Sequence, residues 1–148
     1  MDKFLKNLFI IHSVFQFQVL ALDLDNSFYT KEDNICMERL GVDKAFLNSH
    51  VSESFVLTRG DERYNEYVDC WATEAGVLDD NGRLVYPALE TFISNYMFNL
   101  IRKPNYPNKE EVARNIVNDC KPTAVGDSGA DNVILMANCL YARFMALQ

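Results

Sequence analysis

The fold is decided by residues 61–82, whose sequence is DERYNEYVDCWATEAGVLDDNG. Asp61 is a residue type that caps the N-termini of helices. Apolar side chains then follow at helical spacing, at Tyr64, Tyr67, Val68, Trp71 and Ala75. Gly76 can end this helix, and residues 79–82 (DDNG) are a strong turn signal. The segment therefore predicts an amphipathic helix that carries Cys70 and ends in a tight turn.

Helix signals also precede this segment. Thr30 stands three residues before Asp33, which predicts a capping box for a helix that ends near Gly41. Asp43 is suited to cap a short helix over residues 44–50. Residues 51–58 have the composition of a strand, but they have no partner strand, so an extended connector is expected there.

Three further helices are expected downstream. Pro87 suits the first turn of one helix, and Asn108 with Glu111 predicts a capping box for the next. Asp127 or Ser128 can cap the last helix, which is apolar around more than half of its circumference. A helix of that kind is buried on most sides or lines a cavity. The prediction is one all-α domain of about six helices.

The N-terminal residues 1–21 are expected to be a secretory signal peptide, leaving residues 22–148 as the mature domain. A short basic start precedes an apolar run, and Val19 and Ala21 supply small residues before a cleavage site. An amphipathic first helix that stays in the mature protein is the alternative. No later apolar run approaches the roughly 20 residues of a membrane span. The sequence therefore predicts a secreted, extracellular protein without a membrane span.

Four cysteines remain in the mature part: Cys36, Cys70, Cys120 and Cys139. An even number of cysteines in a small secreted chain favours two disulfides over a metal site. No pair has the spacing of a zinc site, so no metal is expected. Three pairings are possible, and spacing alone does not choose among them.

Charge and motifs exclude several functions. The formal net charge is -7, with 14 basic and 21 acidic residues, which disfavours nucleic acid as a partner. The sequence has no nucleophile elbow, phosphate-binding loop or paired-histidine metal motif. The turn at residues 79–82 lacks the alternating ligands of a calcium-binding EF-hand loop. We therefore expect neither an enzyme nor a cofactor.

The cysteine spacing resembles that of the insect pheromone and general odorant-binding proteins, in their four-cysteine "minus-C" branch. Counting back from Cys70 and from Cys139 by that family's spacing places its two missing cysteines at Glu66 and Ala130. These two positions belong to one disulfide of the six-cysteine pattern, so their joint loss is self-consistent. The run at residues 70–82 also resembles the family's third-cysteine helix and glycine turn. The gap between Cys70 and Cys120 is longer than usual for the family, and a loop around residues 99–107 would absorb it.

The resemblance implies disulfides Cys36–Cys70 and Cys120–Cys139, and an internal apolar cavity. It implies a carrier of small hydrophobic ligands such as odorants, pheromones or related lipids, with a sensory receptor as a further candidate partner. A monomer or weak homodimer is expected. The residues that it places in the cavity are Ala72, Val77, Leu84, Leu89, Phe92, Ile93, Tyr96, Ala137 and Phe144.

Other interpretations remain open. Each of these apolar residues, taken alone, is more often ordinary core than cavity wall. Tyr96 can donate a hydrogen bond to a ligand, although a buried tyrosine more often bonds a nearby carbonyl. His50, the one histidine of the mature chain, could titrate near neutrality and act as a pH switch, but a lone histidine is more often a surface residue. A non-sensory scavenger of amines or lipids and an interaction protein with a filled core are the alternative functions.

Overall fold

The computed structural model describes residues 24–148, so the predicted signal peptide, residues 1–21, lies outside the described residues. These described residues form six α-helices: α1 (Lys31–Leu40), α2 (Lys44–Ser49), α3 (Glu62–Glu74), α4 (Tyr86–Leu100), α5 (Lys109–Cys120) and α6 (Gly129–Met145). Two 3₁₀ turns, η1 (Asn26–Phe28) and η2 (Lys121–Thr123), accompany them. The described part of the chain forms isolated β-bridges but no strand, which confirms the predicted all-α class. None of its helices is long and apolar enough to cross a membrane.

The helices begin mostly where the sequence predicts. The Thr30 hydroxyl and the Asp33 carboxylate form the expected capping box at α1, and Gly41 ends this helix with φ 61°. Asp43 and Asp61 cap α2 and α3, and Ser128 caps α6 by accepting a hydrogen bond from the backbone of Asp131. Local hydrogen bonding is thus sufficient to fix these boundaries.

The capping box predicted at Asn108 is wrong. Asn108 precedes α5 in the left-handed conformation, with φ 54°, and its side chain makes no capping hydrogen bond. A capping residue normally has extended backbone angles, which direct its side chain back to the first turn. Glu110 and Glu111 still lie in that first turn, where negative charge complements the helix dipole.

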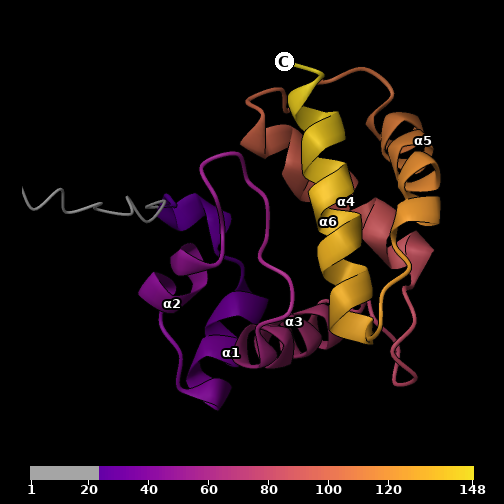
Figure 1. Cartoon of the computed structure of the whole chain (residues 1–148). Coiled ribbons are helices and arrows are strands. Elements are labelled where there is room, and N and C mark those ends of the chain that lie inside the picture. Colours follow the sequence, from indigo (N-terminus) through magenta and orange to yellow (C-terminus); the bar gives the residue numbers. More distant parts are fainter. Residues whose placement is uncertain (1–23) are drawn as a thin grey trace, which may run out of the picture.

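The apolar faces of the helices meet around α6. In Figure 1, α6 runs through the centre of the molecule, α5 lies beside it, and α3 crosses below its first turn. The rings of Phe98 on α4 and Phe144 on α6 pack edge to face, 5.2 Å apart. Side chains from α3, α4, α5 and α6 thereby form one continuous core.

Two disulfides hold this arrangement. Cys36–Cys70 joins α1 to α3, and Cys120–Cys139 joins the end of α5 to α6, with Cα–Cα distances of 5.9 and 5.7 Å. No described cysteine is free. This is the pairing that the resemblance implies. Each bridge closes a loop of tens of residues, which contributes about 3–4 kcal/mol in the chain-entropy model.

The contact between α3 and the start of α6 allows the missing third bridge to be tested. Burial raises the pKa of the Asp69 carboxyl group on α3, and the backbone N–H of Ala130 on α6 partly offsets that rise. Ala130 itself is fully buried. Glu66 lies about one turn before Asp69 on α3, so the two predicted cysteine positions belong to packed helices.

We predict that the double change Glu66→Cys, Ala130→Cys forms a third disulfide without disturbing the native pairs. Intact-mass analysis should show the loss of two further hydrogens, and peptide mapping should show a 66–130 link. The expected gain in stability is up to about 3–4 kcal/mol if the bridge is unstrained. New cysteines that stay reduced, or that pair with native ones, would contradict the alignment to a six-cysteine pattern.

Candidate functional site

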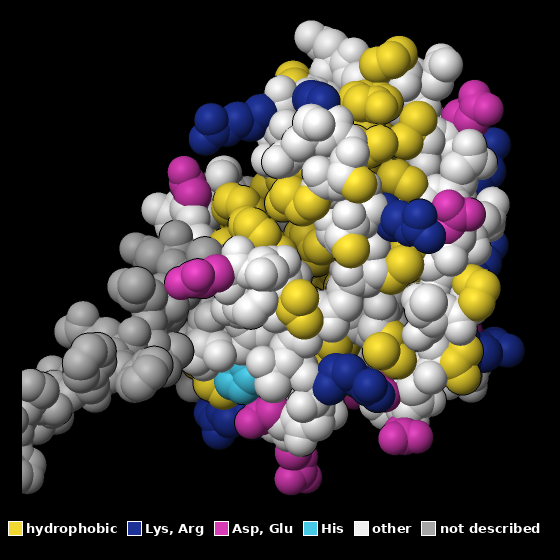
Figure 2. All heavy atoms as spheres, turned by 45° about the horizontal axis from the view of Figure 1, so that its top comes forward, with side chains coloured by type: hydrophobic (Ala, Val, Ile, Leu, Met, Phe, Trp, Pro, Cys, Tyr) yellow, Lys and Arg dark blue, Asp and Glu magenta, His cyan; other side chains and the backbone are white. Residues whose placement is uncertain are grey.

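A cavity of about 680 Å³ lies among the helices. Its walls come from α3, α4 and α6, from the segment that leads into α1, and from the connector between α2 and α3. The lining is mainly apolar or aromatic, with Trp71, Phe92 and Met136 among its larger side chains. Figure 2 shows hydrophobic side chains gathered in a hollow of the surface. Such a volume and lining are typical of a site for a small apolar molecule.

Most of the residues that sequence analysis places in the cavity do line it: Val77, Leu84, Leu89, Phe92, Ile93, Tyr96 and Ala137. Tyr96 is 47% exposed, so it is not the buried tyrosine considered from the sequence.

Ala72 and Phe144 do not line the cavity. Both are fully buried, at 0% exposure. Phe144 follows the lining residues of α6 by about one turn, and its ring packs against Phe98 instead. These two side chains belong to the solid core, because the apolar face of each helix is wider than the cavity wall.

Other lining residues were not identified from the sequence. The apolar stripe of α3 contributes Tyr64, Tyr67, Val68 and Trp71, whose spacing in the sequence predicts only a helix face. The wide apolar surface of α6 could have predicted further lining residues, because Val133, Met136, Leu140 and Tyr141 of this helix also line the cavity. No sequence pattern indicates the lining residues from other parts of the chain, which include Tyr29, Thr30, Asp33, Leu47, Val51 and Leu57.

One end of the cavity is polar. Asp33, in the first turn of α1, lines the cavity and is only 8% exposed. Its carboxylate accepts hydrogen bonds from the hydroxyl of Tyr67, from the backbone N–H of Thr30 at 2.5 Å and from the Thr30 hydroxyl at 3.0 Å. The indole N–H of Trp71 donates to the same Thr30 oxygen at 3.3 Å. The capping box of α1 is therefore also part of the cavity wall.

The charge of Asp33 raises the pKa of three tyrosine hydroxyls. Burial raises the pKa values of Tyr64 and Tyr67, and the negative charge of Asp33 raises them further. The same two causes raise the pKa of Tyr141 to about 12. Within the described residues, the hydroxyls of Tyr64 and Tyr141 make no hydrogen bond. The phenol of Tyr67 therefore donates to this carboxylate, and the neutral phenols of Tyr64 and Tyr141 lie within reach of its charge.

The connector between α2 and α3, residues 51–59, forms a strap along the cavity. Val51 and Leu57 line the cavity from this strap. The ring of Phe55 stacks between Phe28 and Tyr141, at 6.0 and 5.9 Å, and φ of Phe55 is 58°. Residues 51–58 form a connector, as predicted, rather than a strand of a sheet. Its two ends pair through an isolated bridge between Val51 and Leu57, and the chain turns between them.

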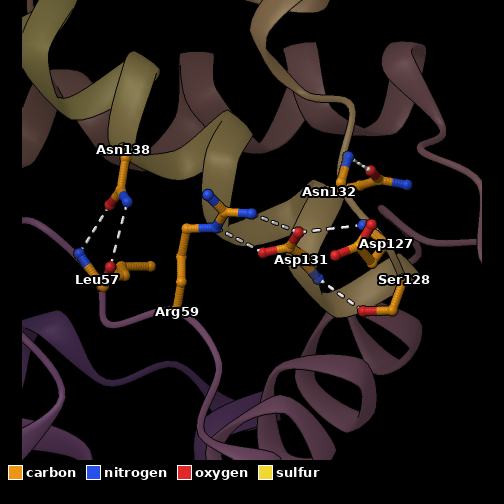
Figure 3. Close-up of polar contacts among 8 residues, drawn as sticks. Leu57, Arg59, Asp127, Ser128, Asp131, Asn132 and Asn138 are labelled. Atoms are coloured by element: carbon orange, nitrogen blue, oxygen red, sulfur yellow. Dashed lines mark hydrogen bonds and ion pairs between the residues drawn. The ribbon is translucent and has the colours of Figure 1, made fainter.

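The strap is fastened to α6 at two places (Figure 3). The side chain of Asn138 accepts a hydrogen bond from the Leu57 N–H at 2.7 Å and donates one to the Leu57 carbonyl at 3.2 Å. Arg59 donates two hydrogen bonds to Asp131, at 2.7 and 2.8 Å. This bidentate pair fixes the end of the strap to the first turn of α6.

His50 is not the surface residue that a lone histidine more often is. Its side chain is only 12% exposed, and its ring stacks on Tyr64 with 4.5 Å between centroids. His50 Nε2 lies 3.6 Å from the Asp61 carboxylate. His50 therefore supports a cavity-lining tyrosine from behind.

Comparison with known families agrees with this architecture. The PBP/GOBP family model matches residues 29–143. The chain belongs to the PBP/GOBP family. No curated protein and no solved structure gave a significant match. The family of insect pheromone and odorant-binding proteins binds and carries small hydrophobic molecules and is not a family of enzymes. The family predicted from the cysteine spacing is confirmed, and the four-cysteine subtype remains a prediction.

Within the described residues, no group of three or more His, Cys, Asp or Glu side chains comes together that could hold a metal ion.

We predict that Arg59→Met lowers the stability of this PBP/GOBP protein at about pH 7 and that the difference becomes smaller in acid. Arg59 lowers the pKa of Asp131 below its ordinary value of 3.8. The unfolded chain therefore takes up this proton before the folded chain does, so the pair stabilises the fold above that value and stops doing so as the pH falls through the folded pKa. Thermal unfolding of both proteins from about pH 7 to about pH 3 measures the effect. A difference in melting temperature that is independent of pH would contradict it.

Proposed function

We propose that this protein is a secreted carrier that takes up one small hydrophobic molecule, such as an odorant, a pheromone or a related lipid, in the cavity between α3, α4 and α6. The observation that carries the proposal is the cavity of about 680 Å³ with its mainly apolar lining. Ligand pockets of small molecules span about 300–1,000 Å³ and combine apolar walls with a few polar groups. The polar end at Asp33 supplies such groups.

The cavity favours a carrier over an interaction protein with a filled core. Protein interiors are packed about as densely as organic crystals, so a filled core leaves few spaces larger than a water molecule. A scavenger of lipids or amines would use the same cavity and the same apolar contacts. It would differ from an odorant carrier in where it is secreted and in which ligand it meets.

The strap supports a carrier because it offers a route of access. Residues 51–59 cover part of the cavity and are held to α6 by Asn138 and Arg59. None of residues 51–59 is fully buried. Segments with few buried contacts open more readily than packed helices. Opening here would expose the apolar lining without unfolding the disulfide-linked frame.

We predict that Ala137→Phe weakens ligand binding at least about tenfold while the fold persists. Ala137 lies on the cavity wall, so an added ring occupies space that a ligand would use. Overpacking costs only about 1–3 kcal/mol, and less where there is room. Calorimetric titration with neutral octyl alcohols, aldehydes and esters measures the binding, and circular dichroism monitors the helices.

The matched control is Ala142→Phe, on the same helix but at an exposed position. This control should bind the same ligands as the unchanged protein. Equal binding by both variants would show that the ligand does not occupy the cavity, and no binding by the unchanged protein would overturn the carrier function.

Secretion can be tested on the full chain. We expect cells of a secreting eukaryotic culture to release a protein that begins near Leu22, because small residues at positions 19 and 21 precede it. Its intact mass should also show the loss of four hydrogens through the two disulfides. Retention inside the cell, or an unprocessed N-terminus on the secreted protein, would contradict the signal peptide.

A further inference from the structure

Among the described residues, no cation lies beside the buried carboxylate of Asp33. No ion pair joins it to any Lys, Arg or His of the described residues. The other buried aspartate at an equivalent helix position, Asp131, is paired with Arg59. Burial of an ionised group is costly unless hydrogen bonds or an opposite charge compensate it. Asp33 is compensated by hydrogen bonds from Thr30 and Tyr67, but no described residue supplies an opposite charge.

The capping box accounts for only part of this arrangement. A carboxylate offers about four acceptor positions, and Asp33 uses three of them for Thr30 and Tyr67. Its remaining capacity lies where it lines the cavity. Among the described lining residues, the one cationic side chain is Arg102, which is exposed and follows α4. The cavity therefore has a negative end within an apolar lining.

Aromatic side chains surround that negative end. Tyr64 is 4% exposed and Tyr67 is 6% exposed, and both line the cavity together with Tyr141. The hydroxyls of Tyr64 and Tyr141, which have no hydrogen-bond partner within residues 24–148, can accept a hydrogen bond. Tyrosine ring faces also attract cations within about 6 Å. A carboxylate combined with several tyrosines is complementary to an ammonium group.

We propose that the polar end formed by Asp33, Tyr64, Tyr67 and Tyr141 binds the protonated amino group of an otherwise apolar amine. This proposal rests on the carrier function proposed above and specifies its ligand class. The alkyl or aryl part of the amine occupies the apolar remainder of the cavity. An alcohol of the same length could also donate a hydrogen bond to Asp33, but it would leave the buried charge uncompensated. The acidic surface of the protein, with a net charge of -7, also attracts cations.

The test compares octylamine with octanol, two ligands of equal chain length, by calorimetric titration of the disulfide-bonded protein at neutral pH. The unchanged protein should bind octylamine more tightly than octanol. Asp33→Asn retains a hydrogen-bond acceptor and removes the charge, so it should weaken octylamine binding about tenfold to hundredfold. Its affinity for octanol should change by less than about threefold, because octanol carries no charge and its hydroxyl can still donate to the amide oxygen.

Asp131→Asn is the matched control. Asp131 has the same exposure as Asp33, 8%, and also lies in the first turn of a helix, but it does not line the cavity. This variant should lose stability with its Arg59 partner and keep the ratio of octylamine to octanol affinity. A second variant, Tyr141→Phe, removes a hydroxyl that has no hydrogen-bond partner among the described residues, so it should fold normally and weaken octylamine binding about fivefold.

The outcomes separate the two proposals. Octanol binding as tight as octylamine binding, or an equal loss for both ligands in Asp33→Asn, overturns the amine proposal and leaves the carrier function intact. If Asp33→Asn does not fold, an unchanged octylamine affinity in Tyr141→Phe overturns it. If neither octylamine, octanol nor the neutral octyl ligands bind the unchanged protein, the carrier function fails as well.

Discussion

The structure depends on the burial of α6. This helix is apolar around most of its surface, and Val133, Ile134, Met136, Leu140 and Phe144 are all at most 8% exposed. A helix of this kind cannot lie on a protein surface, because each exposed large apolar side chain forgoes about 1.5–3 kcal/mol of burial. The other helices must therefore pack against its apolar surface. α3 and α5 pack directly against it, and α4 reaches it through Phe98.

Other helices cover most of the apolar surface of α6, but they do not contact it everywhere. The described structure has a solid core on one part of α6, around Phe144, and a cavity on another, around Ala137. An open space forgoes packing energy. The two disulfides offset this loss because they reduce the entropy of the unfolded chain and tie α1, α3, α5 and α6 into one frame. A hollow interior is thus compatible with a chain of this size.

The first turn of α1 has a double role in this frame. Thr30 and Asp33 form the capping box that begins the helix, and the same Asp33 carboxylate stands at the polar end of the cavity. Tyr67, on α3, hydrogen-bonds to it, so Cys36–Cys70 and this hydrogen bond both fasten α1 to α3. A local interaction that starts a helix therefore also sets the electrostatics of the site. The Arg59–Asp131 pair has the corresponding role at the first turn of α6, where it fastens the strap.

The sequence by itself determined the helical class, most helix boundaries and the family. These features depend on neighbouring residues: Thr30 with Asp33, the stripe from Tyr64 to Trp71, and Ser128 before α6 need only local hydrogen bonds and periodicity. Asn108 was the exception, since its backbone adopts a left-handed conformation that the side-chain pattern does not reveal. Tertiary structure alone decided which apolar residues line the cavity and which fill the core. Ala137 and Phe144 look alike in the sequence pattern, but one faces the cavity and the other packs against Phe98. The polar end of the cavity could not be predicted from the sequence either, because Asp33, Tyr64 and Tyr141 come from three helices that meet only when the chain folds. Periodicity reports which face of a helix avoids water, whereas the distance between two such faces is set by the packing of the whole molecule.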